Sequence, residues 1–373
     1  MAKSLSLLFT SFLFLLLSAG NAQNPDVIRI PDILGYQTIT FDPHLHTVFS
    51  DGLVWPTIRV EEAWSEGIDA ISLTEHIEYR PFQRDVVVND HNRAYDVARP
   101  AAERRDVLLI RGNEITRSMP PGHFNALFHD DSNKLVVTEW RDAFRAARDQ
   151  GAFMLWNHPG WNNQQPGPAQ WHDEHTWLLE NDMLHGIEVI NGLLPNYYSP
   201  EAHQWSLDYG LAIMGSSDAH NPMGMDIDFA AGERRAMTLV FAEERSVKAI
   251  KEAMMNQRTA AYFDNLIAGR EEHLMALFQE SFEIESVTRN RHSFSAVLRN
   301  HSDIPIKLTG KPGANETVEF FQRLTVPPLG STEIYISDLN QENIEEITID
   351  LIVENFLSRP GQGMPVRLTF RPD

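Results

Sequence analysis

The sequence contains no cysteine. Disulfide bonds and thiolate metal sites are therefore excluded, and any metal ion would have to bind His, Asp and Glu side chains. Positive charge is also scarce, because 31 Lys and Arg residues stand against 52 Asp and Glu residues and leave a formal net charge of −21. A nucleic-acid groove needs Lys and Arg to replace phosphate counterions, so no stable nucleic-acid complex is expected. A small phosphorylated substrate, neutralised locally by metal ions, remains compatible with this charge.

Long apolar runs are absent except near the N-terminus. Lys3 precedes an apolar stretch over residues 5–17, and small residues follow at 18–22, where signal peptidase would cut. The stretch is too short to cross a bilayer comfortably, which favours a cleaved signal peptide over residues 1–22, with a retained anchor as the alternative. The sequence therefore predicts an exported protein, periplasmic or extracellular, with no membrane span after signal removal.

Short apolar runs alternate with helix-like segments between about residues 37 and 241. Several runs are almost continuously hydrophobic, which is typical of strands buried on both faces. The segments between them, such as 58–67 and 139–150, have the apolar spacing of helices. Repeated β-then-α units predict an α/β barrel over residues 23–280, with an open doubly wound sheet as the competing architecture. The predicted strands are 37–41, 70–73, 107–110, 124–128, 152–156, 186–190 and 211–214.

The pattern changes after two helix-like segments, 246–257 and 271–278. Short runs with strand-like alternation, separated by Asn, Gly and Pro turns, then fill residues 281–373. These runs are 294–298, 305–308, 319–326, 333–336, 347–353 and 365–370. They predict a small all-β, immunoglobulin-like sandwich as an accessory domain.

Candidate metal ligands stand at the ends of the predicted barrel strands. His44 and His46 lie on the same side of the first strand, and Asp218 and His220 have the same spacing after the seventh. Active sites of α/β barrels lie at the carboxyl ends of the strands, so these side chains are expected to converge. Imidazole and carboxylate ligands together suit Zn, Mn or Fe. The other strand ends carry five further candidates, namely Asp51, His76, Glu114, His123 and His158.

The motifs in these positions resemble those of the polymerase-and-histidinol-phosphatase (PHP) superfamily. The resemblance covers roughly residues 38–270 and implies a distorted (β/α)7, TIM-like barrel that holds two or three divalent metal ions. It also implies hydrolysis of phosphate esters. The motifs are His44-Leu45-His46-Thr47, Ser50-Asp51-Gly52, Thr74-Glu75-His76, Glu114, His158-Pro159 and Ser217-Asp218-Ala219-His220.

The resemblance implies three metal sites, two of which share a ligand. The first site would be formed by His44, His46, Glu114 and Asp218. The second would be formed by Glu114, His123 and His158. The third would be formed by Asp51, His76 and His220.

Three positions are unusual within this pattern. Trinuclear members often have His where Asp51 stands, although an Asp also offers an oxygen ligand. Glu75 stands where the family commonly has Asp, and its implied role is to orient a ligand histidine. His123 comes at the start of its predicted strand, whereas the other ligands follow theirs.

A phosphoesterase of this type needs an activated water and neutralised phosphoryl oxygens. A hydroxide bridging two cations is the expected nucleophile, without a covalent enzyme intermediate. Asp218 or His220 is expected to transfer the proton. Arg80, Arg117 and Arg235 are candidates for binding the phosphate, with ordinary ion pairs as the alternative for each. The expected substrate is a small phosphomonoester or nucleotide.

Two other functions stay open. A metal amidohydrolase acting on amides or lactones also combines a barrel with an early His-x-His motif. Many such enzymes bridge their metals with a carboxylated lysine, and this chain has no lysine between Lys3 and Lys134. A non-catalytic, metal-stabilised binding protein would be expected to have lost ligands, and no ligand position is missing. The sequence does not define an oligomeric state.

Other aromatic and imidazole side chains have structural interpretations. Four tryptophans near the fifth predicted strand are expected to pack its long loop, with stacking on a base or sugar as the alternative. They are Trp156, Trp161, Trp171 and Trp177. The histidines away from the strand ends are expected in loops or on the surface. They are His129, His172, His175, His185 and His203.

Overall fold

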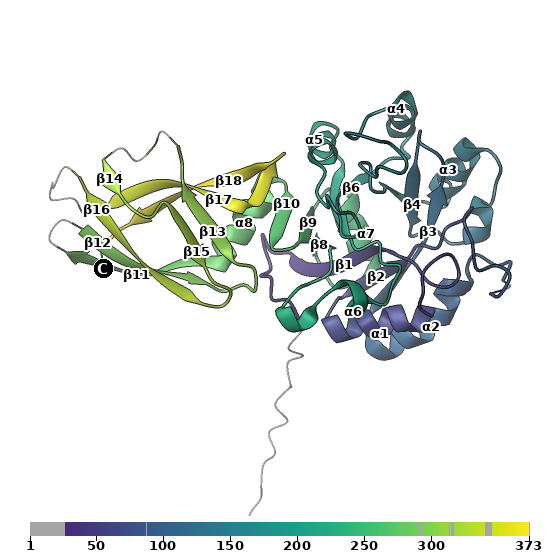
Figure 1. Cartoon of the computed structure of the whole chain (residues 1–373), viewed down its shortest axis with the longest axis horizontal. Coiled ribbons are helices and arrows are strands. Elements are labelled where there is room, and N and C mark those ends of the chain that lie inside the picture. The colour runs from purple at the N-terminus through teal and green to yellow at the C-terminus, as the bar shows by residue number, and fades with distance from the viewer. Residues whose placement is uncertain are drawn as a thin grey trace, which may run out of the picture.

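The chain forms an α/β domain and a β domain that lie side by side (Figure 1). The computed structural model describes residues 27–372, except residues 87, 291–292, 313, 315–316 and 340–344. The predicted signal peptide, residues 1–22, lies outside the described residues. Within the described part of the chain, no helix is long and apolar enough to cross a membrane.

All seven strands predicted for the barrel are present. β2 and β5 are buried along their whole length, because apolar side chains point to both faces of these strands. The seven strands are β1 (Gln37–Leu45), β2 (Ala70–Leu73), β3 (Leu108–Thr116), β4 (His123–Leu127), β5 (Phe153–Trp156), β6 (Gly186–Asn191) and β7 (Ala212–Ser216).

The seven strands are neighbours in chain order. β1, β2 and β3 are parallel, and so are β5, β6 and β7. β4 runs antiparallel between β3 and β5. Its first residue therefore lies at the edge of the sheet where the parallel strands end. This direction explains how His123 can lie beside residues that follow the other strands.

The barrel closes where β7 meets β8 (Met237–Ala242), which pairs antiparallel with β1. Thr238 Oγ1 donates to the carbonyl oxygen of Gly215 at 2.7 Å, and the Gly215 N–H donates back at 3.0 Å. A Cβ atom at residue 215 would lie 2.5 Å from the carbonyl oxygen of Met237, so this approach requires glycine. The predicted α/β barrel is confirmed, and the open sheet is not formed.

Helices cover the outside of the barrel (Figure 1). The ends of α1 are set locally, because Pro56 occupies its first turn and Gly67 ends it in a left-handed conformation with φ 69°. α5 and α7 begin after Ser199 and Ser246, whose side chains accept hydrogen bonds from backbone N–H groups of the first turn. The helices are α1 (Pro56–Glu66), α2 (Arg93–Arg105), α3 (Trp140–Arg148), α4 (Asp173–Glu180), α5 (Pro200–Asp208), α6 (Met223–Asp226), α7 (Val247–Met255) and α8 (Glu271–Ser281), with 3-10 helices η1 (Ser132–Leu135) and η2 (Phe229–Ala231).

Strands beyond the seventh connect the two domains. β8, β9 (Thr259–Phe263) and β10 (Leu266–Gly269) pair antiparallel with one another, and the sequence analysis did not predict them as strands. β10 then pairs in parallel with β17 (Ile347–Arg359), with Ile267 opposite Phe356. The hydrogen-bonded sheet therefore continues from the barrel into the β domain.

The β domain is a sandwich, as predicted. One layer contains β11, β12, β16 and β14, and the other contains β15, β13, β17 and β18. Alternate side chains such as Phe294, Leu308 and Leu351 are buried in the same core. The remaining strands are β11 (Phe282–Asn290), β12 (Ser293–Asn300), β13 (Ile306–Gly310), β14 (Val318–Glu319), β15 (Arg323–Val326), β16 (Ser331–Asp338) and β18 (Gln362–Phe370).

Candidate metal centre

The candidate ligands converge at the carboxyl edge of the barrel. Asp51 and His220 are partly exposed, and the other seven candidates are buried. The nine side chains come from the ends of six strands and form three groups with metal-binding spacing, two of which share His46. These groups are His44, His46 and Asp218; Glu114, His123 and His158; and His46, Asp51, His76 and His220.

His44, His46 and Asp218 form the first group, with one oxygen of Glu114 beside it. The Nε2 atoms of His44 and His46 lie 3.0 Å apart, and each is 3.2 Å from Asp218 Oδ1 and 3.4 Å from Glu114 Oε2. Ligands of a tetrahedral zinc ion with bonds of about 2.0 Å would lie about 3.3 Å apart, close to these separations. In neutral His44, Nδ1–H donates to Glu188 Oε1 at 2.7 Å, so Nε2 presents its lone pair to the group. The donor set fits a divalent cation.

Glu114 lies between the first and second groups. Its Oε1 is 2.8 Å from His123 Nδ1 and 3.6 Å from His158 Nε2, and its Oε2 is 2.9 Å from His76 Nδ1. Despite these distances, neither oxygen of Glu114 has a hydrogen-bond partner among the described residues, and neither has His123 Nδ1. A buried carboxylate without partners is costly. A cation on each side of Glu114 would satisfy these atoms, as the sequence analysis expected of a bridging ligand.

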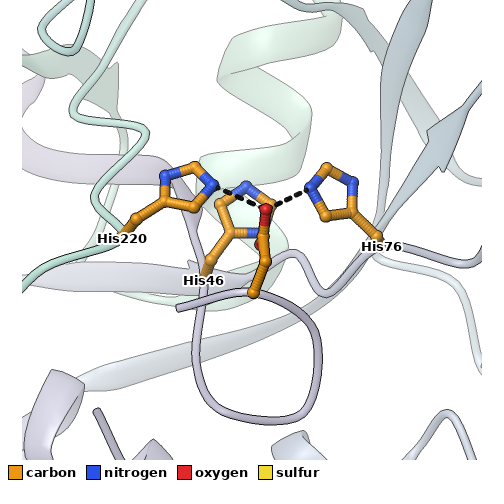
Figure 2. A group of neighbouring side chains, drawn as sticks. His46, His76 and His220 are labelled. Carbon is orange, nitrogen blue, oxygen red and sulfur yellow. Dashed lines mark ion pairs between the residues drawn. The ribbon is translucent and has the colours of Figure 1, made fainter. Parts of the chain in front are cut away.

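The third group surrounds the carboxylate of Asp51 (Figure 2). Asp51 Oδ2 is 3.3 Å from Nε2 of both His76 and His220, and Asp51 Oδ1 is 3.6 Å from His46 Nδ1. Figure 2 shows the three imidazole rings around this carboxylate. His46 therefore faces two groups, with Nε2 toward the first and Nδ1 toward the third. The family resemblance implied His46 as a ligand of the first site alone.

The protonation of the cluster is set by burial and by neighbouring charges. Burial opposes ionisation of Glu114, but nearby histidines, His76 foremost, outweigh it and keep the pKa of Glu114 well below its usual range. Burial lowers the pKa of His46 to about 3, which leaves the neutral, metal-binding form at pH 7. Burial also opposes protonation of His76, but Glu114 and Asp51 outweigh it and raise the pKa of His76 to about 10. A bound cation would therefore displace a proton from His76.

Two candidate ligands have an uncommon backbone conformation. His158 and Asp218 are left-handed, with φ 32° and 53°. Such values are rare for residues other than glycine and persist only where the surroundings impose them. Next to Asp218, the N–H and Oγ of Ser217 both donate to the buried carboxylate of Asp42, at 3.1 and 2.7 Å. Asp42 therefore holds the chain that presents Asp218.

Glu188 is a site residue that the sequence analysis did not identify. Its Oε1 accepts hydrogen bonds from His44 Nδ1 at 2.7 Å and Ser216 Oγ at 2.6 Å. Its Oε2 accepts from the His158 N–H at 2.7 Å and from Asn191 Nδ2 at 2.9 Å. A carboxylate that accepts from a ligand imidazole fixes its tautomer and orientation. The available signal was an acidic residue inside an otherwise apolar strand, β6.

Glu75 acts on a ligand indirectly. Its carboxylate accepts hydrogen bonds from Thr47 Oγ1 and Ser50 Oγ, each at 2.5 Å. Ser50 Oγ lies 3.3 Å from His46 Nδ1. Glu75 can therefore orient His46 through Ser50, which agrees with the role that the family resemblance implied for it.

Replacing Glu188 by glutamine is expected to weaken metal binding about 10- to 100-fold, as observed when the partner of a ligand histidine is removed. The amide keeps the size of the side chain but cannot accept all four hydrogen bonds. Metal affinity is measured by competition with a chelator, and Glu180→Gln, on the exposed end of α4, is the control. Unchanged metal affinity in the Glu188 variant would show that Glu188 does not support metal binding.

The interpretation of Arg235 as a phosphate ligand is wrong. Its side chain is fully buried, Nε donates to Glu66 Oε2 at 2.7 Å, and Nη1 donates to Asp42 Oδ2 at 3.1 Å. Burial opposes the charge of Arg235, but Glu66 and Asp42 outweigh it and raise its pKa above the usual range. Arg235 is the buried counterion of two carboxylates and is not accessible to a substrate.

The other two arginines differ in their positions. Arg80 does not line the cavity at the metal centre, because its guanidinium donates to the carbonyl oxygens of Phe49 and Val88. Arg117 does line this cavity, which has a volume of about 680 Å³. Its Nη2 also pairs with Glu78 Oε1 at 2.8 Å. A phosphate contact by Arg117 stays a prediction, and one by Arg80 is not supported by its position.

One family profile matches the C-terminal part of the chain. Residues 281–369 match the sequence profile of an Ig-like domain family. None of the curated proteins matches the chain significantly. Two solved structures are weakly similar, each over 50% of this chain and 89% of the other. One, from Bifidobacterium adolescentis, is assigned as a metal-dependent phosphoesterase (17% identity, TM-score 0.40), and the other is an amidohydrolase from Chromobacterium violaceum (17% identity, TM-score 0.38).

A much closer relative is a solved two-domain protein from Bacteroides vulgatus, which contains a predicted PHP-like metal-dependent phosphoesterase. The two chains are 48% identical, with a TM-score of 0.88, over 92% of this chain and 98% of the relative. The similarity therefore includes both the barrel and the Ig-like sandwich. With this identity over nearly the full length of both proteins, the chain belongs to the PHP-like family, in its two-domain form.

Proposed function

We propose that the protein is an exported, metal-dependent phosphoesterase that hydrolyses a small phosphomonoester or nucleotide. The main support for the proposal is the environment of Glu114. Its buried carboxylate oxygens face histidines on both sides and make no hydrogen bonds among the described residues. The predicted PHP-like metal-dependent phosphoesterase of the Bacteroides vulgatus relative supports the same reaction class. Export rests on the signal-peptide pattern of residues 1–22.

The three groups of the centre would hold two or three divalent cations, with Zn, Mn or Fe suited to imidazole and carboxylate ligands. When bound, the cations supply positive charge for the phosphoryl oxygens and lower the pKa of water. The chain itself offers little such charge, because Arg117 is the only Arg or Lys that lines the cavity among the residues the structure describes. Neutralisation of the phosphate is therefore assigned to the cations.

The reaction adds water to phosphorus, breaks the bond to the ester oxygen and moves one proton to that oxygen. Inorganic phosphate and an alcohol are the products. His220 is better placed than Asp218 to move the proton. Asp218 Oδ2 already accepts from Asn191 at 3.1 Å, and Oδ1 lies between His44 and His46. His220 lines the cavity, and its Nδ1 is fixed by the Asp218 carbonyl oxygen at 2.8 Å. Its Nε2, 3.3 Å from Asp51 Oδ2, would move the proton in a two-metal form, in which the third group holds no cation.

The proposal is tested with the chain that begins after residue 22. Bound metal is measured by elemental analysis, and turnover is measured with p-nitrophenyl phosphate, bis-p-nitrophenyl phosphate and p-nitrophenyl acetate. We expect two or more metal ions per chain and phosphate-ester turnover that Asp218→Ala lowers at least about a hundredfold, since it removes a direct ligand. Asp208→Ala, on the exposed end of α5, is the control.

The three substrates separate the alternatives. Preference for the first over the second indicates a monoesterase, and the reverse indicates a diesterase. Metal-free protein, or turnover of the acetate ester alone, would contradict the proposal and favour a binding protein or an amidohydrolase respectively.

A further inference from the structure

The cavity at the metal centre is lined by two chemically different sets of side chains. One set consists of the candidate ligands, including Glu114, Asp218 and His220. The other set takes no part in the centre and combines polar side chains with apolar or aromatic ones. The apolar or aromatic members are Tyr79, Met119, Trp161, Leu193 and Leu194. A substrate whose phosphate lies at the ligands would place the rest of the molecule against this second set.

Two aromatic rings flank the ligands directly. The Trp161 ring centroid lies 5.2 Å from that of His158 and 5.7 Å from that of His123, with the planes at 71° and 62°. The Tyr79 ring lies 5.7 Å from that of His76, at 75°. Tyr79 is 52% exposed, so this ring is available to a ligand. The cavity is therefore bounded by an aromatic ring next to each of two metal groups.

Trp161 differs from the neighbouring tryptophans. Trp171 and Trp177 pack against the buried core, and Trp156 is part of it. These three tryptophans therefore have the expected packing role, although they pack in or against the core and not only within the loop. Trp161 instead makes T-shaped contacts with His123 and His158 and lines the cavity. Its position is that of a contact for a bound molecule.

The charge of the lining also limits the kind of group that can bind beside the metal centre. Arg117, the single Arg or Lys of the lining among the described residues, pairs with Glu78 at 2.8 Å and donates to the carbonyl oxygens of Val137 and Thr138 at 2.8 and 3.0 Å. Outside the histidines of the metal centre, the described lining therefore has no cationic side chain left for a second anionic group. An uncharged group that buries apolar surface between aromatic rings gains the most here.

We propose that Tyr79, Trp161 and the adjoining Met119 and Leu193 form a leaving-group subsite for a planar, uncharged group such as an aryl ring. Trp161 is its main specificity determinant. The inference rests on the proposed function, because it takes the phosphate to bind at the metal centre. The subsite would select the leaving group of the substrate, whereas the metal centre would bind only its phosphate.

Binding of two phosphonates to the metal-loaded full chain tests the subsite. Phenylphosphonate and methylphosphonate share the anionic group and differ in the ring, and neither is hydrolysed. We expect calorimetry to give at least about tenfold tighter binding of phenylphosphonate, from the buried ring and its aromatic contacts. Trp161→Ala should remove most of this preference, and Trp161→Phe should restore part of it.

Trp64→Ala is the matched control, because Trp64 is 45% exposed on α1 and stacks on Arg105, away from the cavity. It should keep the wild-type preference. Equal binding of both phosphonates by the wild type, or an equal loss for both in Trp161→Ala, overturns the subsite alone. If neither phosphonate binds to metal-loaded protein, the proposed function fails and the subsite fails with it.

Discussion

Replacing Glu114 by glutamine is expected to lower phosphate-ester turnover by about a thousandfold or more and to reduce the bound metal. Loss of a residue that merely orients a ligand costs about 10- to 100-fold, and Glu114 has a larger role because both of its oxygens face ligand histidines. The substitution keeps the shape of the side chain but removes the negative charge between the groups. Elemental analysis and turnover of p-nitrophenyl phosphate measure the two effects.

The loss must be separated from unfolding. Because the neutral amide is easier to bury than a carboxylate, the metal-free Glu114 variant is expected to keep its fold, as monitored by circular dichroism. Glu61→Gln, which changes a surface residue paired with Arg105, is the control for a Glu-to-Gln change. A folded Glu114→Gln protein with wild-type metal content and turnover would show that Glu114 does not bridge metals.

The barrel and its candidate ligands were predictable because they depend on local patterns. Buried parallel strands are continuous apolar runs, and the chain repeats them at regular intervals. Parallel strands also end at a common edge, so the ligand-like residues that follow β1, β2, β5 and β7 had to approach one another. β3 and β4 supply Glu114 and His123 at that same edge, the latter because β4 is antiparallel. These local patterns did not show which of the residues would share a metal ion.

The roles of buried polar residues were less predictable, because a sequence shows a charge and not its partner. Arg235 pairs with Glu66 and Asp42, which are 169 and 193 positions away. Histidines give a second example, since His175 and His203 are fully buried and not at the surface. His175 Nε2 lies 2.8 Å from the carbonyl oxygen of Pro121, which permits burial of the neutral ring. His129 is buried in the same way, with bonds at both ring nitrogens.

The connection between the domains was also missed. β9 and β10 are short, and β10 gains its second neighbouring strand by pairing with β17 of the sandwich. Asn355 reinforces the junction, because its Nδ2 donates to the carbonyl oxygens of Asn265 and Pro305 at 2.8 Å each. These contacts join residues 90 and 50 positions apart, and no local sequence pattern predicts them. The sandwich is thus attached to the barrel by a shared sheet.

Removal of the Arg235 side chain is expected to destabilise the protein by about 3–5 kcal/mol, the usual result of breaking a buried ion pair. Arg235→Ala leaves Glu66 and Asp42 buried without their counterion. We expect the midpoint of thermal unfolding to fall by about 10 °C, because 1 kcal/mol corresponds to about 2–4 °C in domains of 150–250 residues. Differential scanning calorimetry measures this change.

Two further variants identify the cause of the loss. Arg235→Lys keeps the charge but not the two-pronged geometry, and should be destabilised less than Arg235→Ala. Adding Glu66→Gln and Asp42→Asn to Arg235→Ala should recover part of the stability, because the cost comes from unpaired buried charge. A substrate contact predicts the opposite result, an unchanged unfolding midpoint with a raised KM. That outcome would show that Arg235 belongs to the active site. The hydrogen bonds of its guanidinium to Glu66 and Asp42 instead place it in the barrel core, where Asp42 also accepts from the Ser217 N–H next to Asp218.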